Sequence, residues 1–149
     1  MTTETEEIAA ETTTDNTGAG KCGMDAFNVT KLANEGVKMP LTLPDGTATD
    51  EFLMVCGADS HVFRAEQAKA NRQLLKLAKN QKMDPDKAEH QRQAIQRGLV
   101  AVLVVDWSFD EECSKGAVMR FFEASPQIQM EVDNFAGNRT HFFAKPSST

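Results

Sequence analysis

The side chains best suited to catalysis or metal binding are scattered along this chain. The histidines lie in three separate predicted elements and form no HExxH or HxH pattern: they are His61, His90 and His141. The cysteines are odd in number, far apart and without a Cys or His partner at metal-ligand spacing: they are Cys22, Cys56 and Cys113. We therefore expect reduced thiols, no metal site and no nucleophile paired with a base.

Patterns for cofactor binding are missing from the sequence as well. No GxGxxG or P-loop pattern occurs, and Gly18-Ala19-Gly20 follows no predicted strand. The acidic cluster Asp110-Glu111-Glu112 stands beside Trp107 and Phe109, where its simplest role is to solvate a loop between helices. The sequence thus predicts a protein that is not an enzyme and needs no cofactor.

Composition sets the broad class of the protein. The chain has 149 residues, of which 40% are hydrophobic and 26% charged, so it is long enough for one globular core. Its net charge of -6 works against binding to nucleic acid, because phosphate binding needs concentrated Lys and Arg. No apolar run approaches the roughly 20 residues that span a bilayer, and the N-terminus lacks the order of a secretory signal. We expect no nucleic-acid or membrane partner, and a location in the cytoplasm.

Both ends of the chain differ from its middle. Residues 1–21 are rich in Thr, Glu, Ala and Gly, and bury too little apolar surface to offset their ordering entropy. They are predicted to be a disordered arm, which either orders on a partner or is an inert solubilising leader. Residues 144–149 are expected to be a polar tail, and residues 22–143 a single α+β domain.

The first part of that domain is predicted to be a β-hairpin. Apolar residues alternate with others before a Pro-Asp-Gly turn at 44–46: they are Val37, Met39, Leu41 and Leu43. Residues 51–56 supply the returning strand. Since Pro40 has no amide hydrogen, its strand should lie at a sheet edge or carry a bulge.

Two long helices are predicted after the hairpin. Ser60 caps the first, at about 61–80, and Asp84-Pro85 opens the second, at about 85–105. The end of the second, residues 99–105, is apolar on every face and rich in β-branched residues, so a buried strand competes there. We favour a helix because one apolar face continues through it without a break.

Two shorter helices complete the predicted fold. Ser114 and Ser125-Pro126 open them, and Gly137 ends the second. The expected fold class is therefore α+β, mainly α, with a disordered arm, a β-hairpin and about four helices.

Positive charge is concentrated on the two long helices. Residues 64–97 hold nine Lys or Arg and four acids. Arg72, Lys76 and Lys79 should be exposed there, which makes them candidates for binding an acidic partner. The alternative is that both helix faces are simply solvated.

Three stretches of this sequence resemble the tail assembly chaperones of long-tailed bacteriophages. The first is residues 38–46, Lys-Met-Pro-Leu-Thr-Leu-Pro-Asp-Gly, with the returning strand and residues 57–60, Gly-Ala-Asp-Ser. The second is residues 104–109, Val-Val-Asp-Trp-Ser-Phe, which is similar to an apolar helix that ends in a Trp-containing loop. The third is residues 125–128, Ser-Pro-Gln-Ile, with residues 135–143.

The resemblance implies a mostly helical protein of the host cytoplasm that binds the tape measure protein and tail tube protein during tail assembly. It also implies a longer product made by ribosomal frameshifting. Self-association is left open. The strongest rival interpretation is a virion structural protein, such as a tail, connector or capsid-associated subunit, and a second rival is a regulatory or host-interaction protein without a client.

Late aromatic residues are the candidate apolar contacts with such partners: they are Phe121, Phe122, Phe142 and Phe143. Adjacent phenylalanines on one helix cannot both face one core, although burial of both pairs between short helices is equally open. Trp107 follows an apolar helix end without polar groups around it, so it is expected to be a structural anchor.

Overall fold

A three-stranded antiparallel sheet organises residues 20–143, the part of the chain that this computed structural model describes. Its strands are β1 (Val37–Thr42), β2 (Ala48–Val55) and β3 (Val104–Trp107), in the order β1-β2-β3. β1 and β2 form the predicted hairpin, whose turn contains Gly46 with a positive φ of 90°. Pro40 lies on the edge strand β1, where the register shifts before Thr42, as its missing amide predicts.

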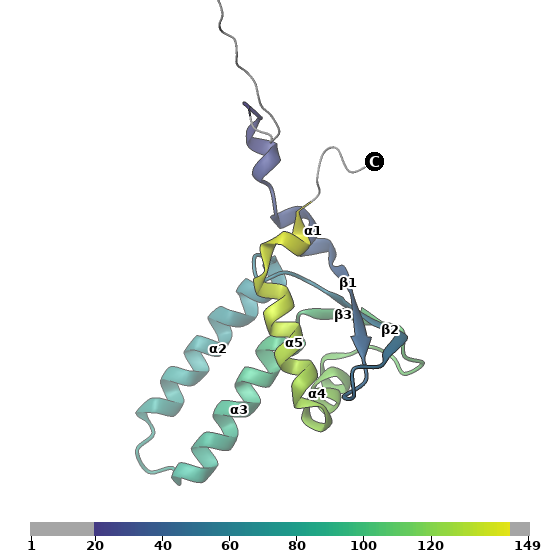
Figure 1. The fold of residues 1–149 in the computed structure, drawn as a ribbon. Coiled ribbons are helices and arrows are strands. Elements are labelled where there is room, and N and C mark those ends of the chain that lie inside the picture. Colours follow the sequence, from purple (N-terminus) through teal and green to yellow (C-terminus); the bar gives the residue numbers. More distant parts are fainter. Residues whose placement is uncertain (1–19, 144–149) are drawn as a thin grey trace, which may run out of the picture.

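Helices make up most of the rest of residues 20–143 and give the predicted α+β, mainly α fold (Figure 1). Residues 20–143 contain α1 (Thr30–Glu35), α2 (His61–Lys79), α3 (Pro85–Ala101), α4 (Lys115–Ala124) and α5 (Pro126–Gly137). Short 3-10 helices, η1 (Met24–Phe27) and η2 (Arg139–Phe142), stand near the two ends of this range. The sequence did not predict α1 or the 3-10 helices. The predicted arm 1–21 lies outside the described residues except for Gly20 and Lys21, and the polar tail lies wholly outside them.

Local capping explains where the predicted helices begin. The side chains of Ser60, Asp84 and Ser114 each accept a hydrogen bond from the backbone amide three residues later. Pro85 and Pro126 occupy the first helical position of α3 and α5, where the missing amide does no harm. The four predicted helix starts are therefore confirmed.

The predicted extension of the second helix to residue 105 is wrong. Helix α3 ends at Ala101, and the β-branched run that follows pairs with β2 as a third strand. The amide of Cys56 donates to the Leu103 carbonyl at 2.7 Å, and Trp107 pairs with Leu53 across the sheet. The edge of β2 that is not paired with β1 supplies these hydrogen bonds. Sequence periodicity could not predict them, because they join segments that are far apart in the chain. Trp107 consequently belongs to a strand and not to a loop.

One face of the sheet is packed and the other is open. Leu53 and Val55 on β2 are fully buried, together with Val118 and Phe122 of α4 and Val132 of α5. On the opposite face the Lys38 ammonium lies 4.4 Å from the centre of the Phe52 ring. Alternation of buried and exposed positions is typical of an antiparallel sheet that is covered on one side only.

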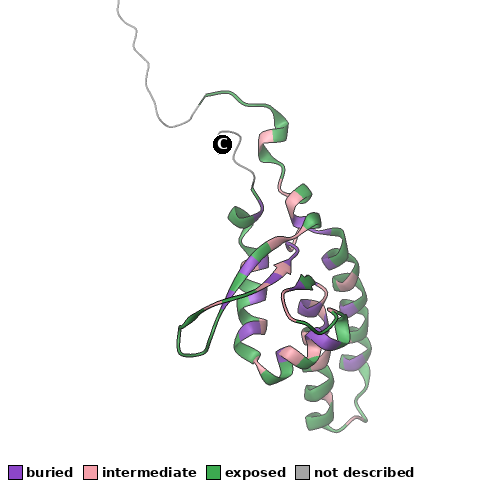
Figure 2. Ribbon diagram, turned by 90° about the vertical axis from the view of Figure 1, so that its right-hand side faces the viewer, coloured by how far each residue is buried: buried purple, intermediate pink, exposed green. Residues whose placement is uncertain are grey.

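Helices α2 and α3 form an antiparallel hairpin that projects beyond this core (Figure 1). Most of its outer residues are exposed or half-buried, although α2 has buried residues along its length, at Phe63, Ala70 and Leu77 (Figure 2). In α3 the buried residues are confined to the base, at Gly98, Val100 and Ala101. The main core cluster thus reaches only the base of the hairpin, and farther out Ala70 and Leu77 of α2 are buried separately from it.

Candidate protein-binding surfaces

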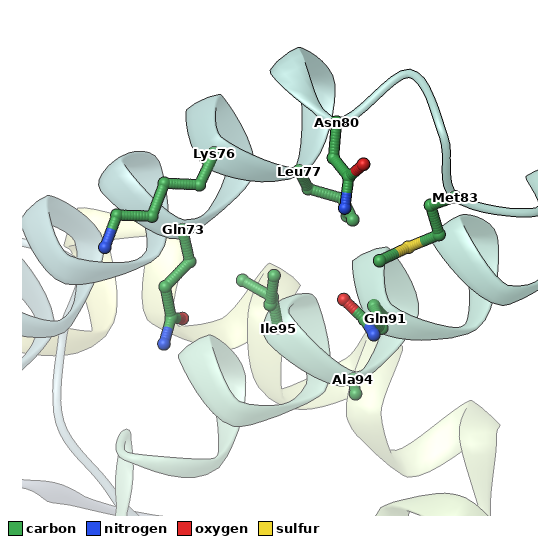
Figure 3. Close-up of a pocket in the computed structure, with 8 residues that line it drawn as sticks. All are labelled: Gln73, Lys76, Leu77, Asn80, Met83, Gln91, Ala94 and Ile95. Carbon is green, nitrogen blue, oxygen red and sulfur yellow. The ribbon is translucent and has the colours of Figure 1, made fainter.

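The seam between α2 and α3 is open on one side as a groove. Near the tip of the hairpin it widens to a hollow of about 510 Å³ (Figure 3), lined by Gln73, Lys76, Leu77, Asn80, Met83, Gln91, Ala94 and Ile95. A second hollow of about 190 Å³ continues toward the core and shares three of these residues, Gln73, Ala94 and Ile95. We call the two hollows together the seam groove.

The sequence of α2 explains why this side of the seam stays open. Four polar residues of α2 line the groove at helical spacing, Glu66, Lys69, Gln73 and Lys76, and the polar Asn80 follows as the C-cap. The apolar residue of α2 in the lining is Leu77, which is buried. Residues three and four apart share one helix face, so the polar side chains form a continuous stripe. Two helices pack tightly where each buries an apolar stripe against the other. This polar stripe of α2 has no apolar side chains to bury, so the seam stays open on this side.

The unpaired charge along the seam groove is positive. The one acid that lines it, Glu66, forms an ion pair with Lys115, with 2.9 Å between Oε2 and Nζ. Lys69 and Lys76 make no ion pair within residues 20–143. The groove therefore presents two ammonium groups to whatever approaches it.

The structure divides the predicted basic surface between two faces of α2. Lys76 lines the seam groove, whereas Arg72 and Lys79 do not. These two lie three and four residues from Leu75, a leucine that is 61% exposed on the outer face of the helix. All three predicted basic residues are exposed, but the fold does not bring them together as one site.

The prediction that Phe142 is an exposed contact is wrong. Its side chain is 1% exposed, and it packs across the ring of Phe135 with 5.9 Å between the ring centres. Phe143 is exposed at 37%. In the other pair Phe122 is fully buried and leaves the candidate surface, while Phe121 stays partly exposed. Phe121 and Phe122 are consecutive in α4, where neighbouring side chains point about 100° apart and so cannot face the core equally. Phe143 follows η2 with extended backbone, which directs it away from the side chain of Phe142.

Trp107 is buried at the centre of an aromatic cluster, as expected of a structural anchor. Its ring meets those of Phe109 and Phe121 edge to face, at 5.2 and 6.1 Å between centres. The indole NH donates to the Glu111 carbonyl at 2.6 Å, which satisfies its polar atom. The acidic segment that was predicted only to solvate a loop thus also supplies the hydrogen-bond partner of the indole.

A partly buried ion pair joins two distant segments of the chain. The Arg139 guanidinium donates two hydrogen bonds to the Asp59 carboxylate, at 2.6 and 2.9 Å, and Arg64 lies 3.6 Å away. Arg139, with a smaller contribution from Arg64, lowers the pKa of Asp59 below its ordinary value. The neighbouring backbone adds a hydrogen bond from the Ala58 amide to the Ala136 carbonyl at 3.0 Å.

An apolar hollow of about 230 Å³ lies where the β-hairpin turn meets the junction of α4 and α5. Each of the three stretches quoted for the phage resemblance contributes to its lining. Residues 41–44 come from the first stretch, Phe109 from the second, and Ser125, Gln127 and Ile128 from the third.

The aromatic wall of this hollow is formed by Phe109 together with Phe121. We call this site the turn hollow. Sequence spacing could not identify it, because its walls come from segments about 80 residues apart.

The residues considered for chemistry stay apart in the fold. His61, His90 and His141 are exposed on α2, α3 and η2. The three cysteines are free, and burial raises the pKa of the Cys56 thiol. Within residues 20–143 no cluster of three or more His, Cys, Asp or Glu side chains has the arrangement of a metal site.

None of the helices in this described range is both long and apolar enough to cross a membrane. Comparison of the chain with models of protein families, with curated proteins and with solved structures yields no match. Within residues 20–143 the seam groove and the turn hollow are the candidate binding surfaces.

Proposed function

We propose that this chain is a tail assembly chaperone of a long-tailed bacteriophage. It binds the tape measure protein and the tail tube protein in the host cytoplasm, and it leaves before the particle is complete. The observation that carries this proposal is the turn hollow, because the three stretches that resemble the chaperone family all line it.

The turn hollow has the chemistry that a chaperone of this kind needs. A tape measure protein is long and largely helical, and its apolar stripes associate with one another until tube subunits cover them. A hollow with a partly exposed aromatic wall can shield one apolar side chain of such a stripe, and several copies can act along one client. Leu43, 51% exposed at the rim, and Phe121 in the wall are the contact residues that we propose.

Co-expression tests this function. The tape measure gene of the same phage is expressed alone, with this chain, and with two single variants of it. We expect the wild-type chain and Leu75→Ser to raise the soluble fraction of tape measure protein, and Leu43→Ser to lose most of that effect. Leu75→Ser is a matched control, because it makes the same change at a similarly exposed leucine on α2, away from the hollow.

Purified virions provide the opposing test. A chaperone should be absent from them, whereas a structural subunit should be present in a fixed ratio to the tube protein. If the chain is found in particles and raises the solubility of neither client, the proposal fails in favour of the virion structural protein.

A further inference from the structure

The seam groove has the length and spacing of a site for a helix. Its lining on α2 runs from Glu66 to Asn80, which at 1.5 Å per residue is about 21 Å, or about four helical turns. The opposite wall comes from α3, where Gln91, Ala94, Ile95 and Gly98 repeat at the same three-and-four spacing. Two antiparallel walls with this repeat form a trough into which the side chains of a third helix can insert.

The floor and rim of the groove differ in polarity. Apolar atoms come from Leu77, Ile95, Met83 and Met119, and the two methionines can adapt to side chains of different shape. The rim carries Lys69 and Lys76, which lack ion pairs within the described range, while its one acid is already paired with Lys115. A complementary ligand is therefore apolar on one stripe and negatively charged beside it.

We propose that the seam groove binds an acidic amphipathic helix of a partner protein, which lies along α2 and α3 as a third helix. The apolar stripe of that helix contacts Met83 and Ile95, which are partly exposed in the groove above the buried Leu77, and its carboxylates meet Lys69 and Lys76. This inference concerns a different surface from the turn hollow and does not depend on the proposed function.

A designed peptide is the probe for this site. It has about 18 residues, with leucines at positions i, i+3, i+4 and i+7 and glutamates beside them, and it carries a fluorescein label. Fluorescence anisotropy is followed as full-length protein is added at about 150 mM salt and again at higher salt. We expect saturable binding that weakens as salt is raised, and no binding of a control peptide whose glutamates are replaced by lysines.

Two charge-reversal pairs on the same helix locate the site. Lys69→Glu with Lys76→Glu alters the groove, whereas Arg72→Glu with Lys79→Glu alters the outer face and changes the net charge equally. We expect the groove pair to weaken binding at least about tenfold, and the outer pair to change it less than about threefold. Thermal melts followed by circular dichroism establish that each variant is folded.

A third variant tests the groove without changing its charge. Ala94→Trp places an indole where the two hollows meet and should also weaken the peptide at least about tenfold. This variant decides the question if the groove pair does not fold.

Three outcomes would overturn the proposal. Wild-type protein could fail to bind the acidic peptide saturably, or the two charge-reversal pairs could lose binding equally, which would show only a diffuse attraction. Alternatively, a uridine RNA of about 20 nucleotides could bind more tightly than the peptide and depend on the same two lysines, which would make the groove a nucleic-acid site. Tape measure solubility is measured with other variants, so either proposal can fail while the other stands.

Discussion

The sheet with α4 and α5, and the projecting hairpin of α2 and α3, are both built from capped helices, but their side chains have very different surroundings. In α4 the side chains of Val118 and Phe122 are fully buried. In α3 the first 13 residues, 85–97, contain no buried position. The helices of both regions therefore begin through the same local capping interactions. The burial of their side chains differs, because it depends on which other elements pack against each helix.

This difference separates stability from binding. Burial of large apolar side chains dominates the free energy of folding, so substitutions in the sheet region should be costly. Apart from the buried Ala70 and Leu77 of α2, the outer hairpin residues contribute little packing, and their identity can follow the needs of a partner. The turn hollow lies at the edge of the packed core, whereas the seam groove runs along the projecting hairpin, and partly exposed apolar side chains line both.

Trp107→Ala should lower the free energy of unfolding by about 3–5 kcal/mol, because it leaves a cavity beside Phe109 and Phe121 and removes an indole hydrogen bond. Urea denaturation measures the change. Leu75→Ala on the outer face of α2 is the control and should cost less than about 0.5 kcal/mol. Equal losses for the two variants would contradict the division between core and hairpin.

Gly57→Ala should destabilise the protein by about 1–3 kcal/mol through overpacking. A Cβ at this position would stand 2.8 Å from the Cβ of Ala33 and 3.2 Å from Cδ2 of Phe142. Gly137→Ala is the matched control, since a Cβ there meets nothing within 4 Å and alanine favours the end of α5. Thermal melts should show a lower Tm for the first variant and an equal or higher one for the second; the reverse order would contradict this packing.

Asp59→Asn should change how stability depends on acid. The pKa of Asp59 is lowered in the folded state, chiefly by the hydrogen bonds from Arg139, so its ion pair stabilises the fold above the unfolded pKa of about 3.9. That contribution is lost as the pH falls through the lower folded pKa. At neutral pH the variant should lose at most about 1 kcal/mol, because Arg139 is exposed to water.

Denaturation midpoints measured from neutral pH down to acid test this prediction. The wild-type protein should lose more stability below about pH 4 than Asp59→Asn does. Asp110→Asn, at an exposed aspartate outside the ion pairs of residues 20–143, should leave the wild-type curve unchanged. Parallel acid curves for the wild type and Asp59→Asn would show that the ion pair does not contribute.

Deletion of residues 1–21 should have the smallest effect, with the Tm unchanged within about one or two degrees. The prediction follows from the low apolar content of this arm, of which residues 1–19 lie outside the described range. Differential scanning calorimetry of the full and shortened chains measures it. A large fall in Tm would mean that the arm contributes to the core.

Features governed by neighbours in the chain could be predicted from the sequence. The Pro-Asp-Gly turn, the edge position of Pro40 and the caps at Ser60, Asp84 and Ser114 all depend on a few consecutive residues. Hydrogen bonds within a turn or a cap form in the same way whatever the rest of the chain does. The β-hairpin and the four long or medium helices were therefore expected, as was the α+β class.

Features governed by distant neighbours were decided only by the tertiary structure. The run 99–105 permits both a helix and a strand, and pairing with the free edge of β2 selected a strand from residue 104. Phe142 and Phe143 have the same side chain, yet the contact with Phe135 buries only the first. The seam groove needs two helices placed side by side, and the turn hollow needs walls from three segments. Burial depends on which surfaces meet in space. Periodicity along one segment can therefore predict the helices and strands, but it cannot predict which of their side chains remain exposed and able to bind a partner.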